Sequence, residues 1–159
     1  MKITILSVGV IKEKYLIDAI NEYTKRLSKY TKVEFVKVAD EPIKENSSEK
    51  ENELIKNKEG KKLIPYLKDK DYKIALALDG VMLSSEELAD KIKNVLTYDS
   101  SNITFVIGGS LGLSKEVLDI CDYKLCFSKM TFPHKLMQVI LLEQVYRSFK
   151  ILNGETYHK

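Results

Sequence analysis

Asn102–Gly112, NITFVIGGSLG, is the most diagnostic stretch of this 159-residue chain. Its first six residues are mostly β-branched or aromatic and uncharged, which is typical of a buried strand. Gly108, Gly109 and Gly112 follow, and glycines at that point let the backbone approach a ligand closely. Ligands of open parallel sheets bind beyond the carboxyl ends of the strands. The stretch therefore predicts a buried strand followed by either a ligand-binding turn or an ordinary glycine-rich turn.

Strand and helix patterns alternate on both sides of this stretch. Four further segments have the composition of strands: Lys2–Val8, Lys32–Val38, Lys73–Leu78 and Tyr123–Phe127. The third of them is expected to end at Asp79-Gly80. Apolar residues at helical spacing separate the strands, and Ser84 with Glu87 forms a capping box before one such helix. The alternation predicts one α/β domain over residues 1–159, with a mostly parallel sheet covered by helices on both faces.

The last helix, from Pro133 to about Ile151, carries apolar residues around most of its circumference. A helix on a protein surface needs only one apolar face. We therefore expect this helix to be buried on two sides, by the sheet and by a second copy of the chain, which predicts a homodimer. Glutamate in place of Leu142 or Tyr146 is then expected to split or unfold the protein.

The overall composition excludes several classes of protein. Apolar residues make up 44% of the chain, which is too many for a disordered protein. No apolar run approaches the roughly 18 residues of a membrane span. The net charge of +3 excludes a histone-like basic surface, so any nucleic-acid site is local or assembled from more than one chain. Cys121 and Cys126 are too few for a disulfide framework, which predicts a reducing, cytoplasmic location. These cysteines and the two histidines lack metal-ligand spacing, so no metal site is expected.

Three of the predicted strand ends converge beside the glycine turn. They are Leu76–Gly80, Ile107–Gly109 and Phe127–Phe132. Their apolar side chains, glycines and backbone carbonyls suit a flat heteroaromatic ligand better than a cluster of phosphates. The chain has neither a G-x-G-x-x-G motif nor a G-K-[ST] motif, so dinucleotide binding and nucleotide triphosphatase chemistry are disfavoured.

Few polar side chains stand out as candidates for chemistry. His134, in the first turn of the last helix, has the position of a hydrogen-bonded structural residue. Glu143 and Arg147 are spaced for an ordinary ion pair on a helix surface. The C-terminal residues 157–159 (YHK) join an aromatic ring, an imidazole and a cation. They form either a frayed terminus or a cap over an active site.

The motifs taken together are more specific than any one of them. A strand ending LALDG, a strand ending FVIGGSLGLS and the C-terminal segment FSKMTFPHKLMQVILLEQVYRSFKILNGETYHK, in a chain of this length, resemble the RlmH family. These are small SPOUT-class methyltransferases that act on a pseudouridine of large-subunit ribosomal RNA. The resemblance implies a SPOUT-type α/β fold with a C-terminal trefoil knot and S-adenosylmethionine held in that knot. It also implies a homodimer that acts on 23S rRNA within the ribosome.

The resemblance indicates which residues serve the reaction. Cofactor contacts fall on residues of the three strand ends, namely Leu76, Gly108, Phe127, Ser128, Lys129, Met130, Thr131 and Phe132. The expected reaction is methylation of N3 of the pseudouridine. Residue type and position favour His158 as base or proton relay, Tyr157 as the group that stacks on or orients the substrate base, and Arg147 as the cation that stabilises the imide anion.

Two alternatives stay open on the sequence: a non-catalytic ribosome-binding or assembly factor on the same fold, and a flavodoxin-like enzyme acting on a small molecule. Thr156 departs from the family pattern, which has a proline before the Tyr-His pair, so a less rigid tail is expected. Residues 155–159 follow the end of the last helix at Gly154. We expect them to lie beyond the regular core, near the methyl group of the cofactor, and to add little to stability.

Overall fold

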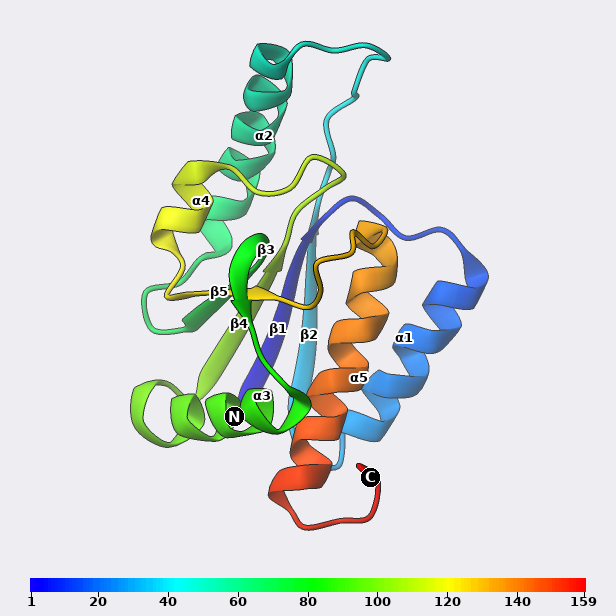
Figure 1. The fold of residues 1–159 in the computed structure, drawn as a ribbon, viewed down its shortest axis with the longest axis vertical. Helices are drawn as coiled ribbons and strands as arrows, with labels where there is room; N and C mark the ends of the chain where they lie inside the picture. Colours follow the sequence, from blue (N-terminus) through cyan, green and yellow to red (C-terminus); the bar gives the residue numbers. More distant parts are fainter.

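The computed structural model, which describes residues 1–159, contains one five-stranded sheet in the order β2-β1-β4-β3-β5 (Figure 1). The strands are β1 (Lys2–Val8), β2 (Lys32–Val38), β3 (Tyr72–Met82), β4 (Asn102–Ile107) and β5 (Tyr123–Cys126). All four pairings between neighbouring strands are parallel. The predicted α/β class is confirmed, and β1, β2 and β4 have the predicted bounds. The trefoil knot stays a prediction.

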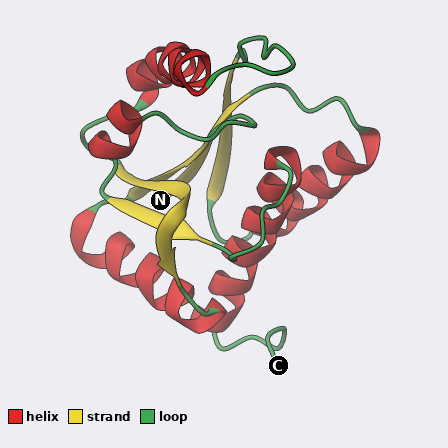
Figure 2. Cartoon of the chain, turned by 45° about the horizontal axis from the view of Figure 1, so that its top comes forward, coloured by secondary structure: helices red, strands yellow, loops and turns green.

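Helices cover both faces of the sheet (Figure 2). One face is covered by α1 (Lys14–Leu27), α3 (Ser85–Asn94) and α5 (His134–Leu152), and the other by α2 (Glu49–Leu63) and α4 (Lys115–Ile120). Two short helical segments, the 3₁₀ helix η1 (Ile64–Tyr66) and the π-helix η2 (Val95–Asp99), complete the elements. Because side chains of a strand alternate between faces, β1 contributes Ile3 and Ile5 to the larger core and Leu6 and Val8 to the smaller one.

Two of the helix starts follow directly from local sequence. The capping box is present, with the Ser84 hydroxyl accepting from the backbone N–H of Glu87 and the Glu87 carboxylate accepting from the N–H of Ser84. Ser114 caps α4 by accepting from the N–H of Val117. These side chains satisfy backbone donors that have no partner inside the helix.

Strand β3 differs from its prediction, because it continues beyond Leu78. Both Leu76 and Val81 pair with Leu125 of β5, so the four residues between them form a bulge that protrudes from the sheet. A Cβ atom at Gly80 would lie 2.8 Å from the backbone of Leu125, so glycine is needed where the chain rejoins the sheet. The bulge leaves Leu78 73% exposed. The predicted stop at Asp79-Gly80 is therefore an interruption of the strand and not its end.

The sequence analysis expected a second chain to bury one side of helix α5, but the helices and the sheet of the same chain already bury Leu142 and Tyr146. It lies between α1 and α3 on the sheet (Figure 1), and its inward residues Leu142, Val145 and Tyr146 belong to the larger core. Leu142 has no exposed surface and Tyr146 only 8%. Glutamate at either position would therefore disrupt the core of one chain, and it cannot report on a subunit interface.

Candidate functional site

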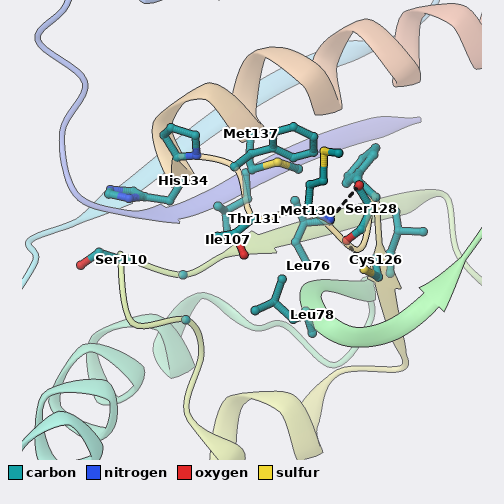
Figure 3. Close-up of a pocket in the computed structure, with 18 of the residues that line it drawn as sticks. Leu76, Leu78, Ile107, Ser110, Cys126, Ser128, Met130, Thr131, His134 and Met137 are labelled. Carbon is teal, nitrogen blue, oxygen red and sulfur yellow. Dashed lines mark hydrogen bonds between the residues drawn. The ribbon is translucent and has the colours of Figure 1, made fainter.

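A cavity of about 500 Å³ opens where the carboxyl ends of β3, β4 and β5 meet the beginning of α5 (Figure 3). Seven of the eight residues assigned to the cofactor line this cavity: Leu76, Gly108, Phe127, Ser128, Met130, Thr131 and Phe132. Lys129 does not. The three predicted strand ends therefore do converge on one concave site, as the parallel sheet requires.

The glycine turn after β4 forms one wall of the cavity. Gly109 and Gly112 are joined by a backbone bridge, and Gly112 has a φ of +88°. A Cβ atom at Gly108 would lie 2.6 Å from the carbonyl carbon of Gly112. The turn is so tight that it leaves no room for a side chain at position 108. The cavity is therefore bounded there by backbone atoms alone.

The loop between β5 and α5 forms the opposite wall. Hydrogen bonds within the loop fix its course: the Sγ of Cys126 lies 3.1 Å from the carbonyl oxygen of Ser128, whose hydroxyl accepts the N–H of Met130 at 3.0 Å. Met130 and Leu78 of the β3 bulge also line the cavity and are each 73% exposed. Two large apolar side chains therefore rim its opening.

The cavity is apolar and carries no fixed charge. No Asp, Glu, Lys or Arg is among its lining residues. The cavity is also lined by Ser110, Met137 and His134, which no motif of the sequence assigned to it. Only His134 could have been found from the sequence, because it begins the helix that follows Phe127–Phe132, one of the three strand ends expected to bind a ligand.

The cysteines and acidic residues elsewhere offer no second centre. Burial raises the pKa of the Cys121 thiol to about 11, so it stays protonated and weakly nucleophilic. No group of three or more His, Cys, Asp or Glu side chains has the geometry of a metal site. No helix is long and apolar enough to cross a bilayer.

The three residues predicted to be catalytic form a second cluster around Glu143. The Oε1 atom of Glu143 accepts from Nε of Arg147 at 3.0 Å and from the hydroxyl of Tyr157 at 3.2 Å. The guanidinium carbon of Arg147 also lies 4.8 Å from the centre of the Tyr157 ring. Burial and the Glu143 carboxylate raise the pKa of Tyr157, so its hydroxyl stays protonated. The predicted ion pair between Glu143 and Arg147 is thus confirmed, and its carboxylate also binds Tyr157 of the C-terminal tail.

His158 is held between two charged groups. Its Nδ1 lies 3.1 Å from a guanidinium nitrogen of Arg147, and its Nε2 lies 2.7 Å from Oε1 of Glu86 on α3. Because a guanidinium only donates, Nδ1 accepts and the neutral ring donates its Nε2–H to Glu86. This hydrogen bond lowers the pKa of Glu86. Nothing in the sequence pointed to Glu86, which is distant along the chain.

The tail is anchored, so the expectation that it lies beyond the regular core is wrong. Tyr157 packs against the larger core, with its ring 5.0 Å from that of Tyr146. Glu155 accepts from Lys150 at 2.8 Å and from the Tyr30 hydroxyl at 2.9 Å, and these bonds lower its pKa to about 2. The contribution of this carboxylate to holding the tail is therefore complete above its ordinary pKa and is lost as the pH falls toward 2.

Within one chain, the cavity predicted to bind the cofactor lies far from the residues predicted to be catalytic. The cavity includes His134 at the first turn of α5, whereas Arg147 lies thirteen positions further along the same helix. At 1.5 Å per residue this separation is about 20 Å. Figure 1 shows the C-terminal tail at the opposite end of α5 from the loop that precedes it. The expectation that the tail lies near the methyl group of the cofactor is not met within one chain.

The parallel α/β sheet with a cavity at its strand ends is the arrangement of a class of α/β methyltransferases, and comparison with known proteins identifies the family. A family model described as "Predicted SPOUT methyltransferase" matches residues 1–158, and the chain belongs to this family. The proteins called ribosomal RNA large subunit methyltransferase H from Alkaliphilus oremlandii, Clostridium beijerinckii and Clostridium novyi are 57%, 56% and 58% identical to it. Each comparison covers 100% of both chains. The resemblance to the RlmH family is confirmed, and the protein is a methyltransferase.

Solved structures support the same fold at low identity. A tRNA (m1G37) methyltransferase from Aquifex aeolicus superposes with a TM-score of 0.55 and 12% identity, covering 92% of this chain and 70% of that one. A Legionella pneumophila protein, solved with the bound cofactor SAM, gives a TM-score of 0.50 and 9% identity, covering 94% and 66%. At these identities the likeness is one of fold alone.

Proposed function

We propose that this protein transfers a methyl group from S-adenosylmethionine to N3 of a pseudouridine in 23S ribosomal RNA. Its family and the names of its full-length relatives support methylation of large-subunit ribosomal RNA. The observation that carries the proposal is the cavity itself, since seven residues that the family resemblance assigns to the cofactor line one concave site.

The cavity has the chemistry that a sulfonium cofactor requires. Its volume of about 500 Å³ falls within the range of small-molecule sites. Leu76, Leu125 and Phe127 offer apolar surface for an adenine ring, and no Lys or Arg is present to repel a positively charged sulfur. When bound, S-adenosylmethionine supplies an electrophilic methyl group. The seven lining residues assigned above are those that would hold it.

The chain must place and deprotonate the imide nitrogen, which is a poor nucleophile while it carries its proton. In our proposal Arg147 turns from Nδ1 of His158 to an imide carbonyl oxygen, where it stabilises the developing negative charge. The freed Nδ1 lone pair then accepts the N3 proton. Glu86, which already accepts the Nε2–H, stabilises the imidazolium that results. Tyr157, held by Glu143, orients the substrate base.

A homodimer would bring the cofactor cavity of one chain close to the Arg147, Tyr157 and His158 cluster of the other. Ile140, Glu143 and Arg147 recur at helical spacing, and none of them is fully buried in one chain. They form an outward stripe on α5. Two copies of this helix packed antiparallel along the stripe would bring the Arg147 end of one chain toward the cavity of the other. The active site would then use residues of both chains.

We expect Ile140→Glu to separate the subunits without unfolding them. Ile140 lies on the outward stripe and is only partly buried in one chain, so the added charge would be buried only in a dimer. Analytical ultracentrifugation should give a dimer for the unmodified protein and a species of 18.3 kDa for the variant, with circular dichroism unchanged. Tyr15→Glu, at an exposed site on α1, is the control. An unmodified protein that sediments as a monomer at micromolar concentration contradicts the dimer.

The RNA partner in this proposal is the 23S rRNA of an assembled ribosome, and the site of action is the cytoplasm. One chain carries a net charge of only +3, which is too little for strong sequence-independent binding to RNA. A dimer doubles this charge and adds shape complementarity, so a folded ribosomal surface is a better partner than free RNA.

The reaction is tested by incubating purified ribosomes that lack the modification with S-adenosylmethionine carrying a labelled methyl group. We expect label in the 23S rRNA, recovered as N3-methylpseudouridine after digestion to nucleosides. Ribosomes already modified at that position are the control and should take up no label. Ribosome binding without any transfer of label would favour the non-catalytic assembly factor instead.

A further inference from the structure

His134 is the one side chain of the cavity that can carry a positive charge. The lining contains no Asp, Glu, Lys or Arg, and its only other ionisable group is the thiol of Cys126. S-adenosylmethionine, by contrast, ends in an amino acid with an ammonium and a carboxylate. An apolar cavity that binds such a zwitterion needs at least one polar partner for it.

The imidazole of His134 is free to serve as that partner. It makes no hydrogen bond within the protein, although it is only partly exposed. The ring lies against Gly9 at the end of β1, where a Cβ atom would stand 3.8 Å from Nε2. Gly9 has a φ of +92°, so the backbone turns away there without a side chain that would cover the ring.

The surroundings of His134 lower its pKa, while the start of α5 beside it favours an anion. Burial lowers its pKa, as does Lys135, while Asp40 and Glu13 raise it. Lys135 is itself engaged by Glu13 at 3.1 Å. The first N–H groups of α5 have no partner inside the helix, and Pro133 offers no side-chain cap. An anion at this position would meet these donors and the positive end of the helix dipole.

The arrangement of the cavity separates its polar end from its apolar end. Figure 3 shows His134 and Ser110 at one end, and Leu76, Cys126 and Ser128 at the other. An adenine ring placed at the Leu76 end leaves the amino-acid end of the cofactor to extend toward His134.

We propose that His134 fixes the direction in which the methyl donor binds, by donating a hydrogen bond to the carboxylate of its amino-acid end. The inference rests on the proposed function in that it takes S-adenosylmethionine as the donor. It assigns His134 a role in binding and leaves the proton transfer to His158. With the carboxylate held at this end, the methyl group cannot reverse its position in the cavity.

Two ligands that differ only in the amino-acid end test this assignment by calorimetry. S-adenosylhomocysteine has that end, and 5′-methylthioadenosine lacks it. We expect His134→Ala to weaken S-adenosylhomocysteine roughly 10- to 100-fold, which is the effect of losing a hydrogen bond to a charged group, and to leave 5′-methylthioadenosine unchanged. His134→Gln, which keeps a donor, should recover part of the affinity.

The pH dependence of binding is a second readout. A carboxylate beside the imidazole raises its pKa in the complex above that in the free protein, so affinity is greatest below the free value and falls as the pH rises through the bound value. We expect this for S-adenosylhomocysteine alone, and not in His134→Gln. Equal losses for both ligands, or none, would overturn the role of His134. A protein that binds neither ligand, at any pH, would overturn the choice of cofactor and this inference with it.

Discussion

His158→Ala should lower the rate of ribosomal RNA methylation by about 10²- to 10⁴-fold, which is the usual contribution of one positioned acid–base group. The imidazole lies between the guanidinium of Arg147 and the carboxylate of Glu86, with its Nδ1 lone pair 3.1 Å from the guanidinium. Its removal eliminates the proposed acceptor of the N3 proton. Single-turnover methylation of ribosomes with labelled cofactor measures the effect.

The affinity for S-adenosylhomocysteine distinguishes a chemical role from a structural one. It should change by less than a few fold in His158→Ala, because the imidazole binds no part of the cofactor in our proposal. Lys159→Ala, at the exposed neighbouring position, is the matched control and should keep its activity. A loss below about 10-fold in His158→Ala would make His158 a binding contact and return the role of base to another group.

Gly108→Ala should reduce the affinity for S-adenosylhomocysteine by at least about 100-fold, which corresponds to ~2.8 kcal/mol. A Cβ atom there would lie 2.6 Å from the carbonyl carbon of Gly112 and 2.8 Å from its oxygen, and backbone atoms cannot move aside as a flexible side chain does. The turn must therefore open, which displaces the wall of the cavity. The geometry indicates that even one methyl group strains the turn.

The same strain predicts a cost in stability of about 1–3 kcal/mol, as for other overpacked positions. Thermal unfolding followed by circular dichroism measures it, and calorimetry at a temperature where the variant stays folded measures binding. Ser101→Ala, at an exposed position directly before β4 and outside the cavity, should retain both stability and affinity. A folded Gly108→Ala protein with unchanged affinity would place the cofactor elsewhere.

Local sequence accounts for most of the secondary structure. The bounds of β1 and β4 follow from runs of mainly β-branched and aliphatic residues, and those of β2 follow from an alternation of apolar and charged residues. The starts of α3 and α4 follow from serine caps. These features depend on residues within a few positions of one another, so a pattern along the chain contains them. The same holds for the convergence of strand ends on one cavity, because parallel strands place their carboxyl ends at one edge of the sheet.

The bulge in β3 and the anchoring of the tail could not be predicted in this way. The bulge exists because Leu76 and Val81 both pair with Leu125, and the residues 77–80 between them contain no signal stronger than one glycine. Tyr157 reaches the core by packing on Tyr146, and a terminal aromatic residue after a helix-ending glycine has the same local pattern whether it frays or folds back.

Sequence alone defined the alternation of strands and helices, the glycine turn and seven of the cavity residues, because each depends on neighbours in the chain or on the family motif. Tertiary structure alone decided that Glu86 and Glu143 hold the tail, that His134 lines the cavity, and that the cavity and the tail cluster lie about 20 Å apart along α5. The physical reason is that hydrogen bonds and burial act between atoms close in space. Residues 86 and 158 become neighbours only when α3 and α5 pack on one face of the sheet.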